Sequence, residues 1–502
     1  MRPASLDQVI RDHAVRIGRR TALACVGRSG AEVMTWRELD EATARLAARL
    51  RDLAAVRAPS CLVVSLVEND LREALALIAC LRVDAPILVV SGWQLETMRH
   101  ALLEEVRRIG YSLVTAASEP PEVLNADRAE PAGATRSFID AGCLLLASGG
   151  STGRPKLIVD RGIRAAPARP AALRPFLATG WHPGQRQLVC SPLYHAAGLT
   201  PFVEGLASGN ASYFLSVFDG RRVGDIVERF RVDWLQMTPF HMSAVLAGDR
   251  RPEAWGRTPR LVHMADHCPP RIKRSFHEAL GPANVYEMYT ASEGIGMTMA
   301  RGDEWDERPG TVGRGYLTAL RVADRDGEPV GPHVIGEVYM RSGARTARSY
   351  LTAAGRLRVS PDGFATLGDV GHLDEDGYLY LRPRQISTIS VAGITVSPAE
   401  VEAELMEHPR IADVGVCSYI SGQFGERVVA VVVPSAGELA ESDVRGWARA
   451  RLSAAQVPTR YVFTSALPRR DTGKLDRDTL FALVNGTNAD QWGKAERTCG
   501  NP

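Results

Sequence analysis

The sequence predicts an α/β protein of two or three domains, built on parallel sheets that are covered by helices. Its 502 residues exceed what one ordinary hydrophobic core accommodates. Apolar segments typical of buried strands alternate with amphipathic helices, as in the succession strand 61–67, helix 71–81 and strand 87–90. A further apolar run at 143–147 leads straight into a loop of small residues.

Composition and charge exclude several classes of protein. Hydrophobic residues make up 45% and charged residues 24% of the chain, as in globular proteins. With 60 basic and 58 acidic residues the net charge is +2, which gives no reason to expect a nucleic acid or a membrane surface as partner. The eight cysteines are scattered without a Cys-x-x-Cys pair, which indicates reduced thiols rather than disulfides or a zinc site.

The N-terminus carries charged residues and no apolar segment, which argues against a secretory signal. No apolar run reaches the length of a membrane span, so we expect a cytoplasmic protein. Residues 6–16 have helical periodicity, and Thr35 and Glu38 form a capping box that opens a long helix. Nothing before Cys143 carries obvious chemistry, and we interpret that region as scaffold.

The loop after 143–147 has the composition of a phosphate-binding site. Glycines let a backbone approach a bulky anion, and hydroxyls and N–H groups donate hydrogen bonds to it. Its residues are Ser148, Gly149, Gly150, Ser151, Thr152 and Gly153, followed by Arg154, Pro155 and Lys156. The spacing is not that of the usual P-loop, because two residues separate the last glycine from the lysine. A flexible Gly/Ser loop without a ligand is the alternative.

Polar residues follow two of the later strands. His195 lies in the segment 192–198, after a strand at 187–191, and a buried structural histidine is the simpler interpretation of it. Asp266 and His267 follow the strand 260–264, where the carboxylate could instead cap the next helix. Strand 234–237 precedes this pair, and three prolines in 161–176 argue against a regular helix there.

Three more segments combine chemistry-bearing residues with turns. Strand 284–289 ends in Tyr289-Thr290-Ala291-Ser292-Glu293, which by itself indicates only a helix start. Asp369 follows a glycine in 366–371, ahead of a hairpin turn at 374–377. Lys474 lies in the basic segment 468–477, where a solvated lysine is the ordinary expectation.

Taken in order from Cys143 to Arg477, these segments resemble the motifs of the adenylate-forming (AMP-binding) superfamily, which contains acyl-CoA synthetases, peptide-synthetase adenylation domains and luciferases. The chain looks most similar to the branch of bile-acid and aromatic acid:CoA ligases. The resemblance implies a large α/β N-terminal domain, with two α/β/α subdomains and a distorted β-barrel, and a small α+β C-terminal lid. We place the N-terminal domain at 1–383, the lid at 384–484 and a disordered tail at 485–502.

The resemblance also implies a role for each residue. Lys474, Glu293 and Arg384 would be catalytic, with Glu293 and Thr152 at Mg²⁺. His195, Asp266 and His267 would line the substrate pocket. ATP would be bound by Ser148, Gly149, Gly150, Ser151, Thr152, Gly153, Lys156, Tyr289, Thr290, Ser292, Asp369 and Arg384.

The implied reaction is ATP-dependent adenylation of a small-molecule carboxylic acid, followed by transfer to CoA or to the phosphopantetheine thiol of a carrier protein, in secondary metabolism. Ile386, Ser387 and Ala392 depart from the family's hinge and acceptor pattern. Two alternatives therefore stay open. One is a diazotase that adenylates nitrite and couples it to an arylamine, which the polar Asp266 and His267 would suit. The other is a catalytically silent nucleotide-binding protein. The acid and the oligomeric state are not indicated.

Overall fold

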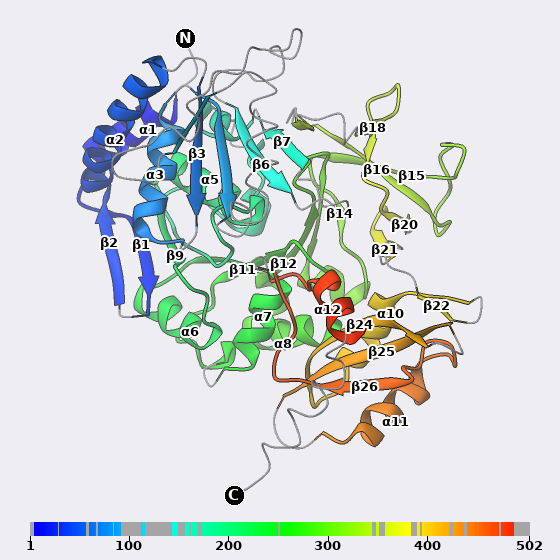
Figure 1. Cartoon of the computed structure of the whole chain (residues 1–502). Helices are drawn as coiled ribbons and strands as arrows, with labels where there is room; N and C mark the ends of the chain where they lie inside the picture. The colour runs from blue at the N-terminus through cyan, green and yellow to red at the C-terminus, as the bar shows by residue number, and fades with distance from the viewer. Residues whose placement is uncertain are drawn as a thin grey trace, which may run out of the picture.

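A computed structural model of the chain shows a large N-terminal domain built on three sheets and a small C-terminal domain beside it (Figure 1). The expected fold class is confirmed. The structure describes residues 5–28, 30–56, 60–66, 69–83, 85–91, 112–115, 143–148, 156–160, 162–168, 173–248, 251–343, 348–350, 357–382, 389–391, 394–421, 425–435, 439–470 and 473–485.

The largest sheet has nine strands in the order β14-β13-β12-β11-β10-β8-β9-β1-β2. Its six central strands are parallel, and the pairs at both edges are antiparallel. The strands are β1 (Thr21–Gly27), β2 (Gly30–Thr35), β8 (Arg186–Val189), β9 (Ala211–Leu215), β10 (Trp234–Met237), β11 (Arg260–Met264), β12 (Val285–Thr290), β13 (Met297–Arg301) and β14 (Arg314–Gly315). The predicted strands 234–237 and 260–264 coincide with β10 and β11.

Helices α6 (Gly220–Arg229), α7 (Pro239–Leu246) and α8 (Pro270–Leu280) connect the strands of this sheet. Between Arg161 and Phe176, the described residues include the short 3-10 helix η2 (Ile163–Ala168), which contains Pro167, and no α-helix. The prolines therefore exclude a regular α-helix from the described part of this segment, as expected.

The second sheet has the order β17-β7-β6-β4-β3-β5. Its strands are β3 (Ser60–Leu66), β4 (Ile87–Ser91), β5 (Ser112–Thr115), β6 (Leu144–Ser148), β7 (Lys156–Asp160) and β17 (Arg348–Tyr350). Strands β3 to β6 are parallel, as predicted. Helices α1 (Leu6–Arg16), α2 (Trp36–Val56), α3 (Leu71–Leu81) and α5 (Ala196–Ser208) supply residues to the core on this side. The Thr35–Glu38 capping box is present at the start of α2.

The third sheet occupies the region expected to be a distorted β-barrel. Its described strands form an open mixed sheet in the order β18-β19-β16-β20-β21, and β15 also pairs with β16. The strands are β15 (Thr318–Ala323), β16 (Gly336–Ser342), β18 (Arg358–Val359), β19 (Ala365–Thr366), β20 (Val370–Leu373) and β21 (Leu379–Arg382). No pairing among these described strands closes the sheet into a barrel. The predicted hairpin turn joins β20 to β21, with Gly377 at φ 80°.

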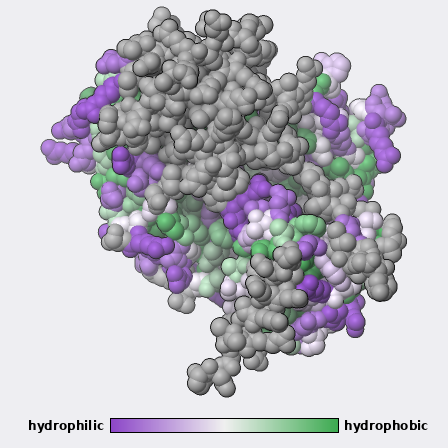
Figure 2. All heavy atoms as spheres, in the orientation of Figure 1, coloured by the Kyte–Doolittle hydropathy of each residue, from purple (hydrophilic) through white to green (hydrophobic). Residues whose placement is uncertain are grey.

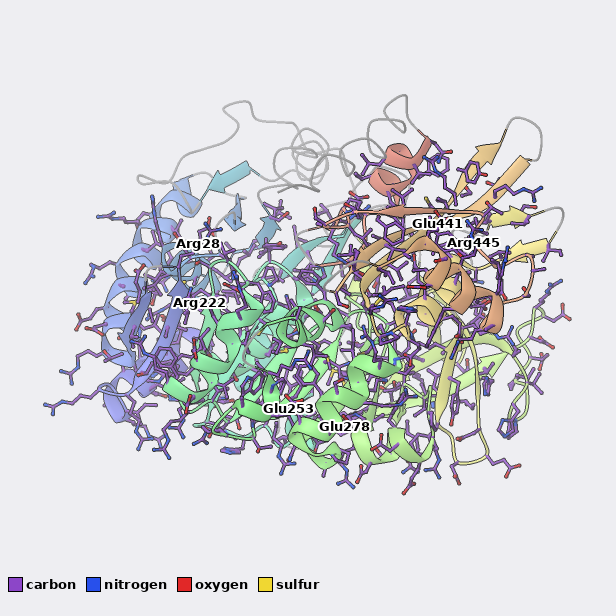
Figure 3. All side chains as sticks on the ribbon, turned by 90° about the horizontal axis from the view of Figure 1, so that it is seen from below. Arg28, Arg222, Glu253, Glu278, Glu441 and Arg445 are labelled. Atoms are coloured by element: carbon purple, nitrogen blue, oxygen red, sulfur yellow. The ribbon has the colours of Figure 1, made fainter. Side chains whose placement is uncertain are left out.

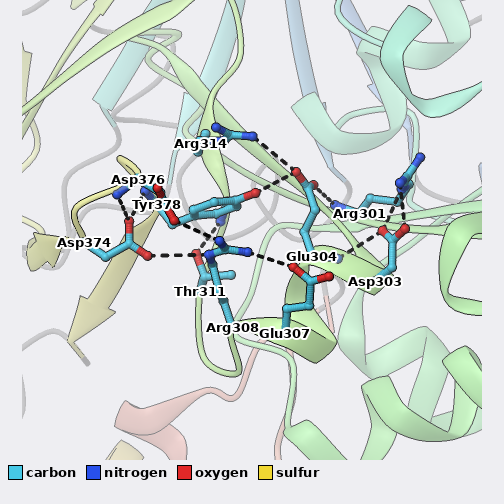
Figure 4. A network of polar contacts seen from close by, with 11 residues as sticks. Arg301, Asp303, Glu304, Glu307, Arg308, Thr311, Arg314, Asp374, Asp376 and Tyr378 are labelled. Carbon is cyan, nitrogen blue, oxygen red and sulfur yellow. Dashed lines mark hydrogen bonds and ion pairs between the residues drawn. The ribbon is translucent and has the colours of Figure 1, made fainter.

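A polar clamp holds the third sheet against the first (Figure 4). The buried Tyr378 ring has the guanidinium groups of Arg308 and Arg314 at 4.5 and 4.6 Å from its centroid, and its hydroxyl donates to Glu304 Oε1 at 2.8 Å. Arg308 also donates to Asp376 across the hairpin turn at 2.8 Å. Glu304 belongs to α9 (Gly302–Glu307), which follows β13. The clamp thus fixes the β20–β21 hairpin relative to the nine-stranded sheet.

The C-terminal domain is α+β, as expected. Strands β24 (Ile411–Ser421), β25 (Gly425–Pro434) and β26 (Arg460–Phe463) form its sheet, with the hairpin β22 (Ile389–Val391)–β23 (Ile394–Val396) and the helices α10 (Pro398–Met406), α11 (Glu441–Arg451) and α12 (Arg477–Asn485). Helix α12 was not predicted, and it includes Asn485, which we had assigned to the tail. Residues 383–388 lie outside the described residues, so the boundary at 384 stays a prediction.

Three expectations drawn from composition concern the polarity of the surface, the state of the cysteines and the length of apolar segments. On the face in Figure 2, hydrophilic residues dominate the outer edge over α1 and α2. Six cysteines are described as free and buried: Cys25, Cys80, Cys143, Cys190, Cys268 and Cys417. Within the described residues, none of the helices combines the length and apolarity required to cross a bilayer.

Candidate active site

Most of the predicted site residues that the structure describes lie at one edge of the nine-stranded sheet. Strands β8, β10, β11 and β12 are parallel neighbours, so their carboxyl ends meet at this edge. His195 follows β8, Asp266 and His267 follow β11, and Tyr289 is the penultimate residue of β12. The carboxyl edge of a parallel sheet is where α/β proteins generally bind ligands.

At the end of β12, two predicted nucleotide-binding residues are directly bonded. Tyr289 Oη donates a hydrogen bond to Asp369 Oδ2 at 2.6 Å, although the residues are 80 positions apart. Asp369 is 9% exposed, and its backbone oxygen accepts from the Val338 N–H at 2.8 Å. The structure therefore offers an aromatic ring and a fixed carboxylate side by side, groups that could contact a flat base and ribose hydroxyls.

The turn after β12 holds Ser292 and Glu293. Gly294, at φ 62°, donates from its N–H to the Ala291 carbonyl, and Thr290 Oγ1 donates to the Gly296 carbonyl at 3.0 Å. The Thr290 hydroxyl is thus bonded within the turn that follows β12. Glu293 is half-buried at the sheet edge. Among the described residues, no three His, Cys, Asp or Glu side chains gather in a group that could hold a metal ion.

The segment before His195 is held by buried polar side chains. Asn69, at φ 50° and 8% exposed, accepts from the Leu193 N–H at 3.0 Å and donates to the Leu215 carbonyl at 2.8 Å. Gln236, from β10, exchanges two hydrogen bonds with Ser191. His195 itself starts α5 without a side-chain cap, and its ring lies edge-on to Tyr194. It is half-buried rather than a fully buried core histidine.

Asp266 and His267 follow Ala265, which has the unusual φ of 83° for a residue with a side chain. Both side chains keep exposed surface, and the Asp266 carboxylate accepts from the His267 N–H at 2.9 Å. Surrounding protein nevertheless desolvates the His267 ring and lowers its pKa; the Glu287 charge opposes this shift, and the Lys273 charge adds to it. The lowered pKa favours the neutral imidazole at pH 7.

Behind this loop, α8 and β12 are joined by a buried ion pair. Lys273 Nζ lies 2.6 Å from Glu287 Oε2, with side chains 4% and 9% exposed. The neighbouring thiol of Cys268 has its pKa raised to about 12 by burial, so it is protonated and unsuited to act as a nucleophile.

The Lys474 turn approaches the same edge from the C-terminal domain. Gly473, at φ 80°, lies against the Phe240 ring so closely that an added Cβ would be 2.7 Å from it. Phe240 follows β10 at the start of α7. Arg469 secures the turn, because its guanidinium donates to the Gly473 carbonyl at 2.6 Å and pairs with Asp413 on β24. Lys474 is exposed.

Ser148 and Lys156 form the last register pair of an antiparallel hairpin made by β6 and β7. Their backbones therefore lie opposite one another, on a strand–loop–strand unit rather than the strand–loop–helix unit of a P-loop. The other predicted loop residues and Arg384 lie outside the described residues: Gly149, Gly150, Ser151, Thr152 and Gly153.

Sequence reasoning missed three residues that shape the site. Asn69 and Phe240 act on the site through contacts with residues distant in sequence, and no local pattern marks a buried asparagine or a ring under another domain's turn. Glu407 contacts the start of α8 from the C-terminal domain. The one available signal was the pair Pro269-Pro270, which leaves a helix start without a side-chain cap.

Comparison with known protein families gives two matches that together span most of the chain. The model of the AMP-binding enzyme family matches residues 10–351, and the model of the AMP-binding enzyme C-terminal domain matches residues 400–474. A feruloyl-CoA synthase from an Amycolatopsis species is 30% identical over 485 residues, covering 92% of this chain and 96% of the relative. An indoleacetate–CoA ligase from Aromatoleum aromaticum is 29% identical over 305 residues, covering 60% and 59%.

Solved structures share the fold. The o-succinylbenzoate CoA synthetase of Bacillus subtilis, in complex with its acyl-adenylate intermediate, has a TM-score of 0.72 at 22% identity, covering 96% of this chain and 98% of its own. An anthranilate CoA ligase in complex with anthranoyl-AMP has a TM-score of 0.75 at 19% identity, covering 95% and 96%.

Proposed function

The chain belongs to the AMP-binding enzyme family, and from that premise we propose that it joins an aromatic carboxylic acid to CoA through an acyl-adenylate. The observation that carries the proposal is the packing of the Lys474 turn on Phe240, which follows β10 at the same sheet edge as the residues that follow β11 and β12. The near full-length likeness to a feruloyl-CoA synthase favours an aromatic acid over a fatty acid.

In the first step, a carboxylate oxygen of the acid attacks the α-phosphorus of ATP. The bond between that phosphorus and the bridging oxygen breaks, and pyrophosphate leaves. Two anions must meet, so the protein's main task is to position them and to neutralise their charge. Lys474 would lie between the carboxylate and the α-phosphate. Tyr289 would stack on adenine, while Asp369 would accept from the ribose hydroxyls.

The remaining charge lies on the β- and γ-phosphates. The backbone N–H groups and hydroxyls of the loop 148–153 would donate to it, together with Lys156. Glu293 and Thr152 would hold Mg²⁺, which when bound offsets phosphate charge. Arg384 would act at the junction of the two domains. His195 and the Asp266–His267 loop would form walls of the acid pocket, where the neutral His267 can donate or accept a hydrogen bond.

In the second step, the CoA sulfur attacks the acyl carbonyl and AMP leaves, while the thiol proton passes to solvent. This step needs no protein nucleophile, in keeping with the protonated state of Cys268.

A product assay tests the proposal. The enzyme is incubated with ATP, Mg²⁺ and ferulate, indoleacetate, anthranilate or octanoate, with and without CoA, and products are identified by mass. We expect AMP with every accepted acid and a thioester only with CoA, with the aromatic acids preferred. A thioester from octanoate alone would overturn the aromatic assignment, and AMP without thioester would point to a carrier-protein thiol. A diazonium product from nitrite plus an aminobenzoate, with no thioester, would replace the proposal.

A further inference from the structure

The start of helix α8 is capped by a residue of the other domain. Its own N-cap position, Pro269, supplies no side-chain hydrogen bond. The Arg271 N–H, in the first turn, instead donates to Glu407 Oε1 at 3.0 Å. Glu407 follows the last turn of α10 and lies 136 positions further along the chain. A carboxylate here satisfies an otherwise unpaired N–H and lies at the positive end of the helix dipole.

Two arginines of α8 extend this contact. Arg274 Nη1 approaches Glu407 Oε2 at 3.4 Å, and Arg271 Nη2 donates to the Ile411 carbonyl at 2.8 Å. The Glu407 side chain is 27% exposed, so its charge is partly shielded from solvent. One turn of α8 is thereby bonded both to the end of α10 and to the beginning of β24.

The loop before α8 faces the same part of the C-terminal domain. Glu402 of α10 pairs with Arg477 at 2.7 Å. Burial raises the pKa of Glu402, and the charge of Asp266 adds to that rise. Burial alone would lower the pKa of Arg477, but the bond to Glu402 and the charges of Glu402 and Asp266 raise it overall. The charge of Asp266 thus acts on the Glu402–Arg477 pair of the C-terminal domain. Arg477 is three residues after Lys474 in the sequence.

Two contacts hold the C-terminal domain, which carries Lys474, against the N-terminal domain. On one side Gly473 packs on Phe240, at the start of α7, and on the other Glu407 binds the start of α8. The two helices follow the neighbouring strands β10 and β11. Because both contacts lie at the same sheet edge, together they orient the C-terminal domain, and with it Lys474, relative to that edge.

We propose that Glu407 is a positioning residue for adenylation, which caps α8 across the domain boundary and so holds the C-terminal domain with Lys474 over the ends of β10 and β11. The proposal rests on the function proposed above. Glu407 touches neither acid nor nucleotide, and it acts through Lys474.

The kinetic test compares Glu407→Ala and Glu407→Gln with Glu278→Ala, which removes an exposed carboxylate from the same helix (Figure 3). We expect Glu407→Ala to slow pyrophosphate release about tenfold, as for the loss of a charged cap, and Glu407→Gln to slow it less, since the amide oxygen still accepts from the Arg271 N–H. Glu278→Ala should match the wild type.

The decisive arm is a double-mutant cycle. In the Lys474→Ala background, Glu407→Ala should cause no further loss, because the lysine that it positions is gone. A full tenfold loss in both backgrounds would overturn the proposal and indicate a general structural role. Glu407→Gln carries the comparison if the alanine variant does not fold.

An activity-independent measurement separates this proposal from the proposed function. Amide hydrogen exchange of the segment 269–275 is followed without acid or nucleotide, and Glu407→Ala should accelerate it about tenfold relative to Glu278→Ala. Unchanged exchange would overturn the capping contact, whatever the activity. Accelerated exchange in a protein that forms no AMP from any acid would refute the proposed function while leaving the contact standing.

Discussion

Tyr289 Oη donates a 2.6 Å hydrogen bond to Asp369 Oδ2, and this bond joins the first sheet of the N-terminal domain to the third. Tyr289 is the penultimate residue of β12, whereas Asp369 lies between β19 and β20. The clamp around Tyr378 keeps the two sheets in place (Figure 4). The carboxylate is therefore held in one orientation before any ligand arrives, which reduces the entropy lost on binding.

The bond between these residues can be tested with Tyr289→Phe, which keeps the ring and removes the hydroxyl. We expect the KM for ATP to rise about 5- to 30-fold with little change in kcat, because the loss of a bond to a charged group is worth about 1 to 2 kcal/mol of nucleotide binding. Steady-state kinetics at saturating acid measure it. Tyr339→Phe, on β16, is the control. An unchanged KM for ATP would mean that the hydroxyl does not orient Asp369 for the nucleotide.

Lys474→Ala should leave ATP binding intact and slow adenylation by about 10² to 10³, the usual cost of removing one charge contact from a closed site. Calorimetry measures ATP binding, and pyrophosphate release measures the chemical step. Arg470→Ala is a control in the same turn, because its side chain approaches Asp476 and Asp478 instead. Wild-type pyrophosphate release from the Lys474 variant would refute the catalytic role.

Ala265 has φ 83°, a conformation that costs a residue with a side chain about 1 kcal/mol. Ala265→Gly should therefore raise the free energy of unfolding by about that amount, measured by urea denaturation. Ala279→Gly, within helix α8, should lower it by a similar amount, since glycine weakens a helix. Equal destabilisation by both substitutions would show that Ala265 is not strained.

We expect the buried His241 to lower the free energy of unfolding in mild acid. Burial lowers its pKa to about 3, and its Nδ1 accepts from the Thr238 N–H at 3.1 Å. The unfolded chain binds a proton below pH 6.5 while the folded chain does not, so stability falls as the pH decreases from 6.5 towards 3. Between pH 7 and pH 5 this histidine should contribute about 2 kcal/mol of that loss.

The variant His241→Gln keeps a hydrogen-bond acceptor and cannot titrate. Its free energy of unfolding should fall less than that of the wild type between pH 7 and pH 5, as measured by urea denaturation at both values. Parallel losses in the two proteins would place the responsible groups elsewhere, for instance at the fully buried His263, whose pKa burial also lowers.

Much of the scaffold was predictable because it depends on local patterns. Apolar runs of four to five residues predicted β10 and β11, and helical periodicity predicted α1 and α3. The Thr35–Glu38 capping box predicted the start of α2. The open third sheet was not foreseen, because short strands carry little pattern of their own and their pairing partners are distant in sequence. Helix α12 was missed because its polar start resembles the tail.

The candidate site likewise combines features that the sequence predicts with features that depend on the fold. The sequence by itself determined the fold class, the family and the order of the motifs, because residue types and short spacings are encoded locally. Only the tertiary structure decided that Tyr289 bonds Asp369, that Asn69 holds the segment before His195, and that Glu407 caps α8 from the other domain. Those relationships join residues 80, 124 and 136 positions apart. They arise when packed sheets and domains bring distant polar groups out of water, where each must find a partner.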